Sequence, residues 1–93
     1  MAYLFEWDPD KAITNLSKHG VTFDEAKTVF GDPNELTIFD EDHSDEEDRY
    51  LSLGTSSLGR VLVVSYTERD DHIRIISART ASKRERIHYE ESS

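Results

Sequence analysis

The sequence predicts an α+β fold with a mostly antiparallel sheet, two N-terminal helices and one C-terminal helix. Two helix-start signals lie in the first third of the chain, segments rich in β-branched residues fill the middle, and a third helix start lies near the C-terminus. Strands joined by short turns pair in antiparallel fashion, and helices then pack on the sheet. Because 93 residues suffice for one domain and not two, we expect residues 1–93 to form a single domain in the order β-α-α-β-β-β-β-α.

The N-terminal segment from Tyr3 to Trp7 is short, aromatic and apolar, which is typical of a strand. Asp8 can cap a helix, and Pro9 suits its first position. Gly20 should stop this helix near His19. The apolar face of the helix is predicted to consist of Ala12, Ile13 and Leu16.

A second helix start follows at once, because Thr22 and Glu25 have the spacing of a capping box. Gly31 and Pro33 should end this helix. Its apolar residues keep helical spacing and are Phe23, Ala26, Val29 and Phe30.

The middle of the chain is predicted to be strands separated by loops and turns. The strands are expected at residues 36–39, 49–55, 60–68 and 72–78. Residues 60–68 are rich in β-branched side chains and should form the central strand. Residues 40–48, DEDHSDEED, interrupt the strands as an acidic loop. Ser82 and Glu85 form another capping box, which opens the last helix.

Composition favours a cytoplasmic protein. The chain has no cysteine, which is typical of a reducing compartment. Its N-terminus lacks the pattern of a signal peptide, and no apolar run approaches the roughly 20 residues that cross a bilayer. We therefore expect no membrane contact.

The charge is unevenly distributed along the chain. The formal net charge is −9, which argues against general attraction to nucleic acid. Residues 40–48 carry seven acidic side chains and no basic one, whereas residues 49–89 carry eight basic and four acidic side chains. The second half of the chain is thus a basic surface joined to an acidic loop.

Several motifs occur in a consistent order along nearly the whole chain. The segment FEWDPDKAITNLSKHGVTFDEAKTVFGDP combines a W-D start, a K-H-G ending and an F-x-E-A-x-x-V-F helix. Arg49 comes a few residues before a glycine, and the C-terminal part holds R-I-I-S-A-R, then K-R-E-R and a tyrosine. Together these motifs resemble the BrnT family, the ribonuclease toxins of bacterial type II toxin–antitoxin pairs.

The resemblance implies a compact fold like that of RelE toxins and RNA cleavage that inhibits translation. It implies no metal and no cofactor. It also implies neutralisation by a BrnA-type antitoxin, binding to operator DNA only through that antitoxin, and assembly as a homodimer or heterotetramer.

Metal-free RNA cleavage needs a base for the attacking 2′-hydroxyl, an acid for the leaving 5′-oxygen and cations for the added negative charge. The candidate catalytic residues are His19, Glu68, Arg79, Lys83 and Tyr89. The candidate RNA-binding residues are Lys11, Lys18, Arg49, Arg69, Arg74, Arg84 and Arg86. Lys11 and Lys18 are seven residues apart and therefore share one helix face.

Arg79 has two interpretations. Its planar guanidinium suits a phosphate, or it pairs with Glu85 and holds the last helix in place. In a regular strand Arg74 and Arg79 lie on opposite faces, and Arg79 shares a face with the strand residues Ile73, Ile75 and Ser77.

Each remaining candidate has a structural alternative. His19 can stabilise a helix end, Tyr89 can pack on the sheet, and Glu68 and Arg69 can be solvated turn residues. The cluster Lys83, Arg84 and Arg86 can steer RNA, form a solvated helix face, or meet an acidic segment of the antitoxin.

The acidic loop lacks the glycine turn and the spacing of a calcium site, so we expect no metal there. A net negative charge fits poorly with RNA cleavage. It favours a second hypothesis, in which the chain is a non-catalytic interaction domain acting as a co-repressor scaffold with a DNA-binding antitoxin.

Overall fold

The computed structural model describes residues 4–44 and 47–92. Along these residues the elements are β1 (Leu4–Glu6), α1 (Pro9–His19), α2 (Phe23–Ala26), the 3₁₀ helix η1 (Lys27–Gly31), β2 (Leu36–Phe39), the 3₁₀ helix η2 (Glu41–His43), β3 (Arg49–Thr55), β4 (Val61–Arg69), β5 (His72–Thr80) and α3 (Lys83–Ser92). The strands form a sheet in the order β1-β5-β4-β3-β2. β1 and β5 are parallel, and the other neighbours are antiparallel. The α+β class, the element order and the central position of β4 are confirmed.

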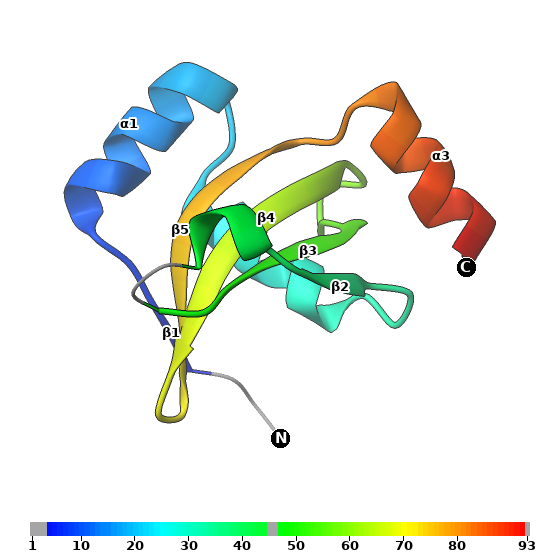
Figure 1. Cartoon of the computed structure of the whole chain (residues 1–93). Helices are drawn as coiled ribbons and strands as arrows, with labels where there is room; N and C mark the ends of the chain where they lie inside the picture. Colours follow the sequence, from blue (N-terminus) through cyan, green and yellow to red (C-terminus); the bar gives the residue numbers. More distant parts are fainter. Residues whose placement is uncertain (1–3, 45–46, 93) are drawn as a thin grey trace.

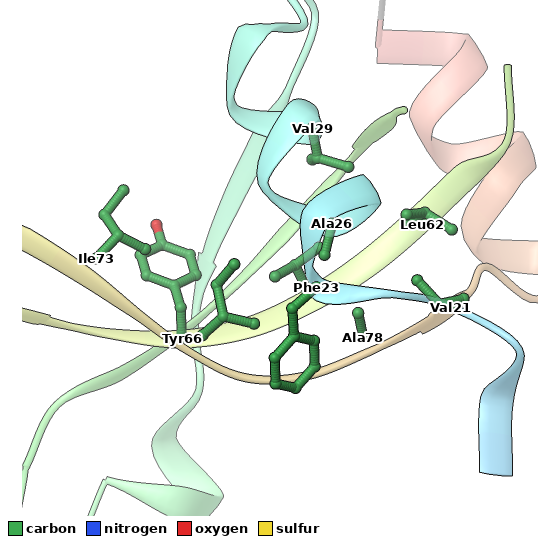
Figure 2. Packing of buried hydrophobic residues seen from close by; sticks show 10 residues of the cluster. Val21, Phe23, Ala26, Val29, Leu62, Tyr66, Ile73 and Ala78 are labelled. Carbon is green, nitrogen blue, oxygen red and sulfur yellow. The ribbon is translucent and has the colours of Figure 1, made fainter. Parts of the chain in front are cut away.

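One face of the sheet, which we call the core face, carries the main apolar cluster. Its strand residues are Leu62, Val64, Tyr66, Ile73, Ile75 and Ala78. Phe23, Ala26 and Val29 of α2 and η1 pack on them and are at most 2% exposed, as Figure 2 shows. Figure 1 shows α2 behind the sheet and α1 and α3 on either side of it. The predicted apolar spacing of α2 is therefore used to cover the core face.

α1 lies along the edge of β5. β1 pairs with β5 only at residues 72–74, and beyond them the side chain of Asn15 takes the place of a strand. Asn15 Nδ2 donates to the carbonyl oxygens of Ala78 at 2.8 Å and Val21 at 2.9 Å, and its Oδ1 accepts from the N–H of Ala78 at 3.0 Å. The predicted apolar face is wrong for Ile13 and Leu16, which are 69% and 49% exposed, because the buried contact of α1 is this polar one.

The ends of α1 follow the prediction. The Asp8 carboxylate accepts the N–H of Asp10 at 2.8 Å, and Gly20 ends the helix in the left-handed conformation. The first strand is shorter than predicted: Trp7 lies beyond it, and Tyr3 lies outside the described residues.

The second helix differs from the prediction after Ala26, where it tightens into η1. The Thr28 hydroxyl donates to the Glu25 carbonyl at 2.6 Å, and a bond of this kind competes with regular helical hydrogen bonding. Only half of the predicted capping box forms. The Thr22 hydroxyl accepts the Glu25 N–H at 3.0 Å, but the Glu25 carboxylate accepts from Ser56 and Arg60 instead.

A β-bulge in β5 overturns the predicted placement of Arg79. β4 and β5 are in register on either side of Ile76, which has no partner in β4. One extra residue reverses the alternation of side chains beyond it. Arg74 and Arg79 therefore share one face, opposite to Ile73 and Ile75, and the expectation of opposite faces is wrong. β5 also continues two residues beyond its predicted end, to Thr80.

Candidate functional site

The second face of the sheet, which we call the cationic face, is defined by Arg49, Arg74 and Arg79. Arg49 of β3 pairs with Thr67 of β4, and Thr67 pairs with Arg74 of β5. Arg79 pairs with Val63 further along β4. Because directly paired residues point to the same side of a sheet, three arginines from distant parts of the sequence face the same way.

A cleft of about 280 Å³ lies between α1 and β5. Lys11, Lys18 and His19 line it from α1, and Ile76 and Ser77 line it from β5. The two lysines share a helix face, as their spacing predicts. Because Ile76 and Ser77 lie between Arg74 and Arg79 in the sequence, the cleft adjoins the cationic face. The structure thus places three of the predicted site residues, Lys11, Lys18 and His19, in the cleft. Arg74 and Arg79 lie on the adjoining sheet face and do not line the cleft.

Arg79 forms a two-point ion pair with Glu85. Its Nη1 and Nη2 donate to the two carboxylate oxygens at 2.7 Å and 2.9 Å. The Arg79 guanidinium lowers the pKa of the Glu85 carboxyl to about 2, against the opposing effect of burial. Glu85 also accepts the Ser82 N–H at 2.8 Å and donates its own N–H to the Ser82 hydroxyl at 3.2 Å. The second capping box is confirmed, and Arg79 fastens it to the end of β5, as one of its two interpretations predicts.

Two further arginines have carboxylate partners. Arg74 Nη1 lies 3.8 Å from Glu6 Oε1, and Arg69 Nη2 lies 3.2 Å from Glu47 Oε2. All these side chains are about one-third exposed or more. Exposed ion pairs of this kind contribute about 0–1 kcal/mol. An anionic group from outside the chain can therefore replace a carboxylate partner at small cost.

The acidic loop borders the cationic face. The Thr67 hydroxyl donates to the Asp48 carbonyl at 2.7 Å, and the N–H of Asp40 donates to the Arg49 carbonyl at 2.9 Å. In Figure 1 the short helix η2 of this loop lies in front of the sheet. Among the residues that the structure describes, Nε of Arg49 is buried without a hydrogen-bond partner. The most acidic and the most basic parts of the sequence are thus neighbours.

Tyr89 and Glu68 are not part of this arrangement. The Tyr89 hydroxyl donates to Asp32 and accepts from the Thr55 hydroxyl at 3.0 Å. Burial, together with the Asp32 carboxylate, raises the pKa of Tyr89. Tyr89 thus joins α3 to the sheet, as its packing alternative predicts. Glu68 pairs with Ile73 and so belongs to the core-face side of β4.

The cations of α3 are divided. Lys83 begins the helix and is exposed, as is Arg86. Arg84 lines a second hollow, between α3 and the sheet.

Asp10, Thr14 and Ser77, which line the α1–β5 cleft, were not expected there. The adjacent apolar pair Ile75-Ile76 breaks strand alternation and is a sequence signal for the bulge that turns Ser77 toward the cleft.

Within residues 4–44 and 47–92, no group of three His, Asp or Glu side chains is placed to hold a metal ion. No helix in the same part of the chain is both long and apolar enough to cross a membrane.

Comparison with known proteins relates the chain to a family and to a solved structure. A family model described as "Ribonuclease toxin, BrnT, of type II toxin-antitoxin system" matches residues 7–85. The fold is similar to the crystal structure of the Brucella abortus ribonuclease toxin BrnT, with a TM-score of 0.65 and 21% sequence identity over 88% of this chain and 100% of the other. No curated protein matches the sequence.

Proposed function

The chain belongs to the BrnT family of ribonuclease toxins of type II toxin–antitoxin systems, and from this premise we propose that it cleaves RNA at the cationic face and the adjoining α1–β5 cleft. A type II toxin has an antitoxin partner. We propose that this partner is of the BrnA type, that it carries the contact with operator DNA, and that the two proteins assemble in the cytoplasm.

The observation that supports cleavage is the placement of Arg74 and Arg79 on one sheet face beside a cleft lined by Lys11, Lys18 and His19. We assign the two arginines to the scissile phosphate, because guanidinium donates parallel hydrogen bonds to phosphate oxygens. The two lysines hold the RNA backbone on either side. This assignment uses three side chains that line the cleft and two arginines of the adjoining sheet face.

His19 lines the cleft, and an imidazole can both accept and donate a proton. In the proposed reaction the 2′-hydroxyl oxygen attacks the neighbouring phosphorus, its proton passes to a base, and the bond from phosphorus to the 5′-oxygen breaks as an acid protonates that oxygen. We assign one of these proton transfers to His19. The arginines stabilise the additional charge of the transition state.

Cleavage of a labelled single-stranded RNA, in buffer containing a metal chelator, tests the proposal. We expect Arg79→Ala and His19→Ala each to slow cleavage about 100-fold or more. Lys27→Ala is the matched control, because Lys27 is an exposed cation in η1, which packs on the core face, and it should leave the rate unchanged. Circular dichroism checks folding, since Arg79 also fastens α3.

Equal rates in wild type and in both site variants would refute the site. Dependence of the rate on added divalent metal would refute the metal-independent reaction.

The scaffold alternative is favoured by the carboxylate partners of Arg69, Arg74 and Arg79. In that case the purified chain leaves RNA intact at every protein concentration but still binds the antitoxin and strengthens its retention on operator DNA. A gel shift with and without the chain separates this function from RNA cleavage.

A further inference from the structure

A groove of about 280 Å³ between the sheet and α3 has no part in the proposed cleavage. Ile38, Leu51, Leu53 and Val63 form its apolar floor, and Arg84 and His88 belong to its wall. Ile38 is 45% exposed, although it sits in a strand. An exposed apolar hollow with a charged rim is typical of a surface that binds another protein.

The groove is continuous with the cationic face. Val63 of the floor is the cross-strand partner of Arg79. Glu85, which also lines the groove, is the carboxylate that holds the Arg79 guanidinium. Any segment that fills the groove therefore lies against Glu85, the carboxylate partner of Arg79.

We propose that this groove is the docking site of the antitoxin, and that its occupant is an amphipathic segment with acidic side chains. Apolar side chains of the segment fill the floor, and its carboxylates meet Arg84 and the neighbouring exposed Lys83. Charge complementarity selects an acidic partner at this rim.

Docking rests on the toxin–antitoxin function proposed above but not on RNA cleavage. If the docked segment also blocks Arg79, the segment and RNA compete for the same surface. The two parts are tested separately.

Isothermal titration calorimetry of the full chain against the purified product of the adjacent reading frame tests docking. We expect Ile38→Glu to weaken binding at least about 30-fold, since it places a charge on the apolar floor. Arg84→Glu should weaken binding about tenfold and reduce its dependence on salt. The controls Leu58→Glu and Lys27→Glu make the same charge changes at exposed positions outside the groove, and binding should stay within about threefold of wild type, as surface positions outside an interface allow.

Unchanged binding by Ile38→Glu and Arg84→Glu, with melting temperatures matching the controls, would overturn the proposal. So would a dimer of the chain alone that Ile38→Glu converts to monomer in analytical ultracentrifugation, because the occupant is then a second copy.

RNA cleavage is measured on the same samples. If the groove variants lose antitoxin binding and the wild-type chain does not cut RNA, the docking proposal is supported and the proposed RNA cleavage is refuted. An antitoxin-bound chain that cuts RNA as fast as the unbound one overturns the blocking of Arg79.

Discussion

The core face and the cationic face share strands β3, β4 and β5 but are stabilised differently. On the core face, Ile73, Ile75 and Ala78 are closed off from water by α2 and η1. On the cationic face, the same β5 strand presents Arg74 and Arg79, which are partly exposed and paired with acids. Apolar burial supplies most of the stability of a fold, whereas exposed ion pairs supply little. A second apolar cluster, Leu53, Val63 and Tyr89, is buried between the other face and α3. The division is therefore clearest along β5, where the apolar side chains stabilise the fold and the arginines remain partly exposed.

The largest effect that we expect is on the free energy of unfolding, when an isoleucine is shortened to alanine on each of the two faces. Ile75→Ala should lower the free energy of unfolding by about 2–5 kcal/mol, because Ile75 is 1% exposed and a cavity is left. Ile38→Ala, on the opposite face at 45% exposure, should cost less than about 1 kcal/mol. Urea unfolding measures both, and equal losses would contradict the division of the faces.

The edge of β5 is a third environment, because the polar side chain of Asn15, and not an apolar side chain, forms the contacts there. Asn15→Ala leaves the N–H and carbonyl of Ala78 and the carbonyl of Val21 without their partner. We expect a loss of about 2–3 kcal/mol in unfolding free energy and faster hydrogen exchange at the Ala78 amide. Asn34→Ala, at an exposed position, is the matched control. If the two variants exchange and unfold alike, α1 is held by other contacts.

The main helices and strands could be predicted because each has a local signal, whereas the 3₁₀ helices η1 and η2 were not predicted. Asp8 and Gly20 mark the ends of α1, and Ser82 and Glu85 mark the start of α3. The role of Asn15 could not be predicted, because an asparagine within a helix gives no indication of which backbone groups its amide will meet. Tertiary contacts alone decide this.

The site was only partly predictable for a related reason. The charge pattern pointed to the second half of the chain, which supplies Arg74 and Arg79, and helix periodicity placed Lys11 and Lys18 on one face of α1. The face of Arg79 depended on one unpaired residue, Ile76. A single extra residue reverses every side chain beyond it, so alternation counted along the sequence gave the wrong face. Tyr89 was separated from the site by its contacts with Asp32 and Thr55, neither of which is near it in the sequence.

The smallest effect that we expect is the contribution of the Arg79–Glu85 ion pair to the free energy of unfolding. Arg79 holds α3 through this pair and is also the cation that we assign to the phosphate. The folded-state pKa of Glu85 is lowered from 4.5 to about 2, chiefly by Arg79. The pair therefore stabilises the fold fully above pH 4.5, and this stability is lost as the pH falls toward 2. Because the Arg79 side chain is 44% exposed, we expect no more than about 1 kcal/mol at pH 7.

Glu85→Gln measures that contribution without removing the capping box, since glutamine can occupy the same box position. Its unfolding free energy in urea should fall below that of wild type at pH 7, and the difference should shrink as the pH drops from 4.5 to 2. Glu91→Gln, at an exposed position, should follow wild type throughout. A loss well above 3 kcal/mol at pH 7 would mean that Glu85 holds Arg79 too tightly for a phosphate to replace it. The cationic face would then be part of the structural framework, as the core face is, and the proposed cleavage would lose its central cation.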